Sequence, residues 1–259
     1  SRIQLTPQDL MEGPDALETY AGMRAFLARQ DEIAALLRSI GGVELGVAFL
    51  GEIQTYSVSP KRQRPVTSLP PSFWMQIGVG LAGFWIGAWI WALRRGEWAT
   101  RFLLLAGVGL MISAFPAAVY STRELALPGG LFRVLSTFNH IGALTFGVGM
   151  IGLFLVYPRK LVSPRWLALP AIVLGAWQVV DILQLAEGPG LGFHLAVVLA
   201  MLAIVVLVAI QFRVTRGHPR DRAALAWLGL AVIVGAGAFV TTVIAPHALG
   251  IGTFVSQGE

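Results

Sequence analysis

Cysteine is absent and charged residues are scarce in this chain. Without cysteine, disulfide bonds, thiolate metal sites and cysteine catalysis are excluded. Only 13% of the 259 residues are charged, 56% are hydrophobic, and the mean hydropathy is +0.71. Soluble domains are about one quarter charged, so this composition indicates a protein that crosses a membrane several times. Asparagine is also nearly absent, and Asn139 is the only one.

The motifs of common catalytic sites are absent as well. The sequence has no P-loop, H-E-x-x-H pair, nucleophile elbow or acidic metal cluster, so it predicts no catalytic residue and no metal site. Residues 78–83 and 147–152 match the G-x-G-x-x-G pattern of dinucleotide-binding folds. Neither segment follows a strand, and both lie within long apolar segments. We interpret them, together with Gly83-x-x-x-Gly87, as small-residue surfaces that let helices approach closely.

Apolar segments dominate the chain after a basic, proline-containing linker that ends near residue 70. Each segment is long enough for a helix, rising about 1.5 Å per residue, to cross a hydrocarbon core of about 30 Å. The sequence therefore predicts an all-α polytopic membrane bundle over residues 70–259. We expect about six transmembrane helices: 73–93, 102–120, 134–157, 167–185, 193–212 and 223–244.

Residues 1–69 have a different, soluble composition. Apolar side chains recur at helical spacing from Asp15 to Ser39. Two short strand-like runs, 43–50 and 53–58, follow on either side of Gly51-Glu52 and predict a hairpin. We therefore expect a small α+β N-terminal segment. A helix followed by such a hairpin resembles the C-terminal half of a PDZ-like domain, without the first half.

The distribution of Lys and Arg predicts the orientation in the membrane. Alternate loops carry unequal numbers of cations, and the richer set belongs on the cytoplasmic side. The richer set has ten: Arg94, Arg95, Arg101, Arg159, Lys160, Arg165, Arg213, Arg216, Arg220 and Arg222. The poorer set has five: Lys61, Arg62, Arg64, Arg123 and Arg133. We therefore expect a bacterial inner-membrane protein whose N-terminal segment and C-terminal tail are both extracytoplasmic. Because the excess cations lie at the membrane, they do not indicate a nucleic-acid partner.

Polar side chains are expected to gather at one depth of the bundle, near its outer end. Asn139 and His140 lie about 9 Å along the third predicted helix. Gln178, Asp181 and Gln184 recur at spacings of three residues near the end of the fourth, and His194 begins the fifth. The candidate ligand-binding or proton-sensing residues are Tyr120, Arg123, Asn139, His140, Trp177, Gln178, Asp181, Gln184 and His194.

Asp181 is the only acidic residue inside any predicted transmembrane helix. A carboxylate in hydrocarbon costs about 2.5–3.5 kcal/mol on insertion scales, so it should face the bundle and find a partner. His140, His194 or Arg123 could supply that partner. One interpretation is an outward-facing pocket that binds a ligand or senses protons, with His140 as the titrating group. The other is an interhelical hydrogen-bond cluster that only holds two helices together.

No cofactor is predicted, and haem is the alternative considered. His140, His194 and His247 are all expected near the outer level, where two of them could be axial ligands. The paired histidines of membrane cytochromes usually lie well inside facing helices, however, and His194 and His247 fall at or beyond the helix ends.

The later helices resemble a known family. Residues 151–159 close one helix with I-G-L-F-L-V-Y-P-R, a Trp/Gln/Asp helix follows, and residues 220–227 open the sixth with R-D-R-A-A-L-A-W. These segments are similar to the multi-span sensor regions of bacterial two-component histidine kinases of the competence-pheromone receptor type. That family also has a PDZ-like extracytoplasmic segment. The phosphoacceptor helix and the ATP-binding boxes of a kinase are absent from this sequence.

The resemblance implies the input region of a homodimeric membrane receptor for a small-molecule or peptide ligand, in contact with membrane lipids. In that interpretation, one more membrane crossing after Glu259 would lead to a cytoplasmic kinase, and residues upstream of Ser1 would supply a signal peptide or a first crossing. The alternative is a transporter, or a membrane protein that binds a lipid or cofactor, in which the same polar cluster would be a substrate or proton site. A purely structural membrane subunit is a third possibility, and it predicts that the cluster tolerates substitution.

Overall fold

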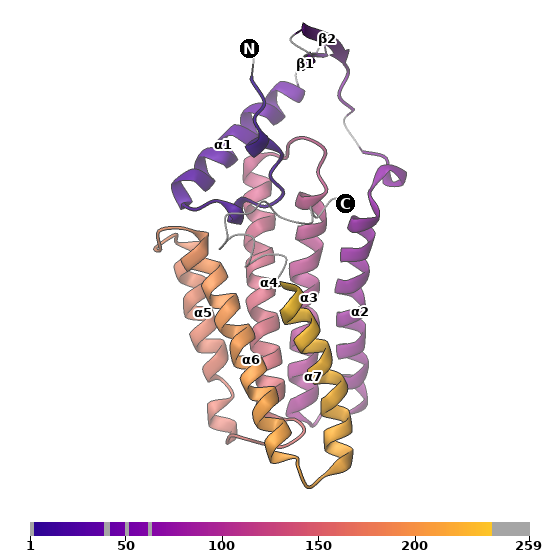
Figure 1. The fold of residues 1–259 in the computed structure, drawn as a ribbon, viewed down its shortest axis with the longest axis vertical. Coiled ribbons are helices and arrows are strands. Elements are labelled where there is room, and N and C mark those ends of the chain that lie inside the picture. The colour runs from indigo at the N-terminus through magenta and orange to yellow at the C-terminus, as the bar shows by residue number, and fades with distance from the viewer. Residues whose placement is uncertain (1–2, 39–41, 50–51, 62–63, 240–259) are drawn as a thin grey trace.

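The computed structural model of the chain describes residues 3–38, 42–49, 52–61 and 64–239. It is mostly helical, with a bundle of long helices, a short helical segment across one end of the bundle, and a two-stranded hairpin beyond that segment (Figure 1). Within the described residues, five helices are long and apolar enough to cross a membrane. The chain is therefore a candidate multi-pass membrane protein, as the composition predicts.

The five candidate membrane helices match the first five predicted ones. Their helical segments are α2 (Pro71–Leu93), α3 (Trp98–Ser121), α4 (Gly129–Val156), α5 (Leu169–Ile182), which a 3-10 turn (Pro164–Trp166) precedes, and α6 (Leu195–Val214), which a π-helical turn (Gly190–His194) precedes. A further helix, α7 (Pro219–Phe239), covers most of the sixth predicted helix but is not among the five. Residues 240–244 of that predicted helix lie outside the described residues, so the count of six is not confirmed.

Glycines allow α3 to approach α2 on one side and α4 on the other. A Cβ added to Gly142 of α4 would lie 2.3 Å from the backbone nitrogen of Ser113 in α3. A Cβ on Gly107 of α3 would lie 2.4 Å from the carbonyl oxygen of Gly83 in α2. Such close backbone approach is how membrane helices gain packing energy without a hydrophobic effect. Gly83 belongs to the first G-x-G-x-x-G segment, which is therefore a packing surface, although Gly78 of the same segment faces open space.

The N-terminal helix α1 (Tyr20–Leu37) lies against the bundle and buries one face there. It begins later than the predicted Asp15 because Pro14–Ala16 form a 3-10 turn and the Thr19 side chain caps the first helical turn, accepting a hydrogen bond from Gly22 N at 3.1 Å. Tyr20, Met23, Phe26 and Leu27 of α1 are buried against Tyr120 of α3 and Phe132 of α4. We call residues 3–38 the cap.

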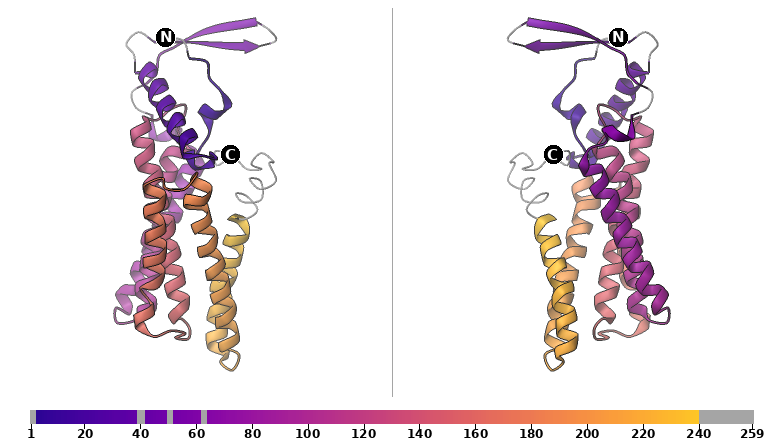
Figure 2. Two further views of the ribbon diagram at one scale, coloured as in Figure 1. Left: turned by 90° about the vertical axis from the view of Figure 1, so that its left-hand side faces the viewer. Right: turned by 90° about the vertical axis from the view of Figure 1, so that its right-hand side faces the viewer.

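The hairpin consists of β1 (Val43–Phe49) and β2 (Glu52–Val58), paired antiparallel from Val43 opposite Val58 to Phe49 opposite Glu52. It projects beyond the cap, away from the bundle (Figure 2). The small two-stranded sheet is therefore confirmed, while the PDZ-like interpretation stays a prediction.

Candidate functional site at the junction of cap and bundle

Asp181 lies where the cap meets the bundle and is only 6% exposed. Its carboxylate accepts hydrogen bonds from three directions. Tyr20 Oη of the cap donates to Oδ1 at 2.7 Å. On Oδ2, His140 Nδ1 of α4 lies at 2.8 Å and Gln178 Nε2 of α5 donates at 3.3 Å. Three converging donors compensate a buried carboxylate, so His140 is the partner that the sequence left open among three candidates.

His140 extends this network toward a second carboxylate. Its ring stacks on Phe193 with the centroids 3.7 Å apart and is 4% exposed. Because Nδ1 faces Asp181, Nε2 points the other way, where Asp15 Oδ2 of the cap lies 4.0 Å away. His194 Nε2 lies 3.4 Å from the same oxygen. Tyr20 and Asp15 of the cap are thus linked through Asp181, His140 and His194 of the bundle, and we call these five residues the junction network.

Contacts with the bundle shift the pKa values of two cap residues, Asp15 and Tyr20. Burial raises the pKa of Asp15, but the hydrogen bond with His194 and the charges of His140 and His194 outweigh it, lowering the pKa to about 2. Burial, and then the hydrogen bond to the Asp181 carboxylate, hold the pKa of Tyr20 well above its usual range. Asp15 is therefore an anion and Tyr20 a neutral donor at any physiological pH.

Two glycines between α5 and α6 allow the cap to reach the network. A Cβ on Gly192 would lie 1.8 Å from Tyr20 Oη, and one on Gly188 would lie 1.9 Å from the carbonyl oxygen of Glu18. The Tyr20 amide also donates to the carbonyl oxygen of Glu187 at 3.3 Å. A larger residue at Gly188 would displace the cap backbone, and one at Gly192 would displace the Tyr20 hydroxyl.

Arg123 lies outside the junction network and holds the cap in a different way. Its guanidinium donates to the cap carbonyls of Met11 and, at 3.1 Å, Glu12. It also lies over the Phe132 ring, 4.7 Å from the centroid. Burial lowers the pKa of Arg123, and the charge of Glu12 opposes that shift. Arg123 therefore fixes the path of the cap across the end of the bundle, and it is not the partner of Asp181.

A second ion pair stabilises the cap internally. Asp9 is fully buried and accepts from Arg29 Nη2 at 2.9 Å and from Nε of the same guanidinium. The hydrogen bond from Arg29 is the main cause of the lowered pKa of Asp9. The segment that precedes α1 is thereby fastened to α1.

The remaining predicted site residues have structural contacts. Asn139 Nδ2 donates to Ser113 of α3, at 2.9 Å to Oγ and 3.0 Å to the backbone oxygen. Trp177 Nε1 donates to the carbonyl oxygen of Leu191 at 3.1 Å, tying α5 to the π-helical turn. Tyr120 stacks on Phe132, with the centroids 5.4 Å apart. Asn139 and Trp177 therefore join helices to one another.

Gln184 is not on the face of a helix, which corrects the expectation from its spacing. The helix α5 ends at Ile182, and Gln184 has a φ of +53° in the left-handed region. The Gln184 amide bonds to the Asp181 carbonyl at 2.9 Å and the Leu185 amide to the Val180 carbonyl at 3.0 Å, which is a Schellman motif. The Gln184 side chain instead accepts a hydrogen bond from Arg24 of the cap.

A cavity of about 20 Å³ adjoins the junction network, lined in part by Ser136, Thr137 and Arg133 of α4. That volume suits about one water molecule. In the described residues no group of three or more His, Cys, Asp or Glu side chains is arranged to hold a metal ion. Of the three histidines considered for haem, His247 lies outside the described residues.

Sequence reasoning missed the contribution of the cap. Asp15 is one of eight acidic residues in segment 1–69, and no sequence pattern distinguishes it from the others. The one available signal was the requirement that Asp181 find partners, and that requirement does not say from which segment they come.

Comparison with known proteins gives no relative. No protein-family model, no curated protein and no solved structure matches the chain.

Proposed function

We propose that this chain is the membrane-embedded sensor region of a bacterial two-component receptor, and that it reads its signal at the junction network. The observation that carries the proposal is the alternation of acids and imidazoles across the junction. Asp15 and Tyr20 belong to the cap, while His140, Asp181 and His194 belong to three different segments of the bundle. A change of charge or of hydrogen bonding at one of these groups acts on the cap and on α4, α5 and α6 together.

The junction network can exist in two states, which differ in the protonation of its two imidazoles. With both imidazoles protonated, two cations balance two carboxylates. With neutral imidazoles, His140 donates through Nδ1 to Asp181 and turns an acceptor nitrogen toward Asp15. The second arrangement binds the cap less tightly. A proton or ligand shifts the equilibrium only by its differential affinity for the two states, and going from 1:99 to 99:1 requires about 5.5 kcal/mol.

The family resemblance of the later helices and the charge distribution support the same proposal. The cation-rich loops follow α2, α4 and α6 at the end of the bundle opposite the cap (Figure 1). By the positive-inside rule the cap then faces the extracytoplasmic side, where an external signal arrives. A polar, buried junction under an extracytoplasmic cap is what an input region for an external ligand or for protons requires.

The first test is the coding sequence beyond the codon for Glu259. A further membrane crossing, followed by a phosphoacceptor-histidine helix and an ATP-binding domain, is the expected result. A stop codon at or directly after Glu259 would contradict the receptor-kinase assignment and favour the alternative, a transporter or a lipid- or cofactor-binding membrane protein.

The second test is made in the intact receptor. Asp181→Asn and His140→Gln should alter kinase output while the protein still inserts into the membrane at normal levels. Glu44→Gln is the matched control, because Glu44 is exposed on the hairpin, which projects away from the bundle (Figure 2). Unchanged output in both junction variants would leave the network with only a structural role.

A further inference from the structure

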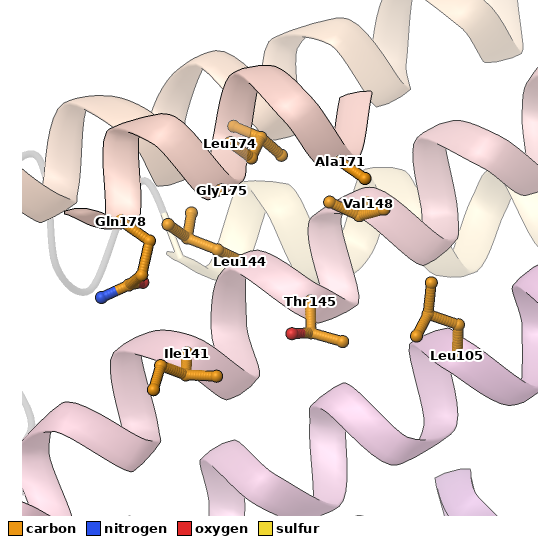
Figure 3. A pocket seen from close by; sticks show the side chains of 9 residues that line it. All are labelled: Leu105, Ile141, Leu144, Thr145, Val148, Ala171, Leu174, Gly175 and Gln178. Atoms are coloured by element: carbon orange, nitrogen blue, oxygen red, sulfur yellow. The ribbon is translucent and has the colours of Figure 1, made fainter. Parts of the chain in front are cut away.

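A groove of about 290 Å³ lies between α4 and α5, with Leu105 of α3 at one end. Its walls are mostly apolar side chains, among them Leu105, Leu144, Val148 and Leu174. Figure 3 shows Gln178 at one end of the groove and Leu105 at the other. Gly175 and Ala171, which also line it, are exposed on the outer surface of the bundle.

All residues that line the groove belong to candidate membrane helices. For helices that cross a membrane the surrounding medium at that depth is hydrocarbon, so lipid chains are the molecules available to fill the groove. The part of α5 that forms one wall, from residue 171 to residue 178, rises about 10 Å along the helix. A groove of this length and apolar lining accommodates a segment of an extended acyl chain.

One polar atom of a residue at the end of the groove has no hydrogen-bond partner among the described residues. Gln178 is 8% exposed, and its Oε1 is buried without a hydrogen bond. The amide orientation is fixed, because only the NH2 group can donate to the Asp181 carboxylate and the reverse orientation would bring two oxygens together. An unsatisfied amide oxygen in hydrocarbon is costly, so Gln178 Oε1 requires a donor from outside the described part of the chain.

We propose that the groove binds an acyl chain of a membrane phospholipid whose head group carries an N–H or O–H donor, and that this donor pairs with Gln178 Oε1. Gln178 lies about 6 Å below the end of α5, a depth that a head group at the membrane interface can reach. The Gln178 amide then connects the bound lipid to Asp181, because its oxygen accepts from the lipid while its nitrogen donates to that carboxylate. The lipid site stands independently of the sensor proposal.

Native mass spectrometry of the purified chain tests the site. The probes are dioleoyl phosphatidylethanolamine and dioleoyl phosphatidylglycerol, which have donors, and dioleoyl phosphatidylcholine, which has the same chains and no head-group donor. One hydrogen bond corresponds to a preference of about two- to tenfold for the lipids with donors. Gln178→Leu should abolish this preference.

Groove filling provides the second measurement. Gly175→Phe places a ring at the groove, where a Cβ meets no atom within 4 Å, and should remove the retained lipid. Gly78→Phe is the matched control, because Gly78 of α2 is exposed, faces open space and does not line the groove. Equal retention of all three lipids by the unmodified chain would overturn the pairing with Gln178. Lipid retention that Gly175→Phe leaves unchanged would overturn the site itself.

Discussion

Tyr20 makes the direct hydrogen bond between the cap and Asp181, and it offers the cleanest single-atom test of the junction. In Tyr20→Phe the ring remains in the buried cluster around Phe132, while the 2.7 Å bond to the carboxylate is lost. A hydrogen bond to a charged group contributes about 1.5–3 kcal/mol. We expect faster amide hydrogen exchange in α1, corresponding to a loss of that size in opening free energy.

The matched control for that change is Tyr56→Phe. Tyr56 is 51% exposed on the hairpin and donates only to Gln54. Removal of the Tyr56 hydroxyl should leave amide hydrogen exchange in α1 unchanged. Equal exchange in both variants would mean that Asp181 does not hold the cap through Tyr20.

The lowered pKa of Asp15 predicts how the docking of the cap on the bundle depends on pH. Its pKa is lowered in the folded chain, so its contribution is present above the unfolded pKa near 4 and is lost as the pH falls toward 2. The contribution is on the order of 2 kcal/mol. The titratable groups that interact with Asp15 are His140, His194 and Tyr120. Spin labels can be placed on exposed Ala35 of α1 and exposed Val134 of α4. We expect the distribution of distances between the two labels to broaden as the pH falls from about 4 to about 2.

Asp15→Asn should reduce this broadening. A smaller acid response should remain, since the pKa of Asp9 is also lowered, by Arg29. An identical acid profile in the variant would show that Asp15 does not control docking.

Asn139 joins two membrane helices and is expected to affect their stability alone. Asn139→Ala removes both hydrogen bonds to Ser113 of α3. Interhelical hydrogen bonds in membranes average about 0.6 kcal/mol, with a maximum near 1.7. Unfolding in mixed micelles should show a loss within that range. Thr137→Ala is the control, because Thr137 bonds to Arg133 within its own helix, and a loss as large as that of Asn139→Ala would contradict the interhelical assignment.

At the scale of elements, the connection between α5 and α6 decides whether the cap can dock. It passes directly under the start of α1, and a Cβ on Gly188 would lie 1.9 Å from a cap carbonyl oxygen. A backbone atom cannot yield as a flexible side chain does. Gly188→Ala should therefore release α1 and expose it to proteolysis, while the helical content of the bundle is retained.

Gly190 provides the comparison two residues later. A Cβ there meets no atom within 4 Å, so Gly190→Ala should leave the cap protected. Similar proteolysis of the two variants would show that the connection between α5 and α6 tolerates side chains and does not control docking of the cap.

At the scale of the whole molecule, the cation distribution predicts which end of the bundle faces outward. The chain has no cysteine, so each introduced cysteine is a unique label site. Glu44→Cys is on the hairpin, and Gly96→Cys lies in the exposed turn between α2 and α3 at the opposite end. In intact cells a membrane-impermeant maleimide should label position 44, and position 96 only after permeabilisation. The reverse pattern would place the cap in the cytoplasm.

The sequence by itself predicted the five helices that are long and apolar enough to cross a membrane, because burial in hydrocarbon requires long apolar segments whatever their neighbours are. It also determined that Asp181 must be paired, since the cost of an unpaired carboxylate in the membrane does not depend on the fold. The helix–hairpin order of the N-terminal segment followed from local periodicity and from Gly51-Glu52. Each of these features depends on composition or on short-range spacing.

Only the tertiary structure decided which side chains meet. Asp15 and Tyr20 lie more than 100 residues from His140 and Asp181 in sequence, and no local pattern relates them. The assignment of Arg123 to cap carbonyls and the turn at Gln184 likewise depend on where α1 and the α5–α6 connection lie in space. The reason is physical: a polar group in an apolar bundle fixes the need for a partner, whereas the packing of distant segments fixes its identity.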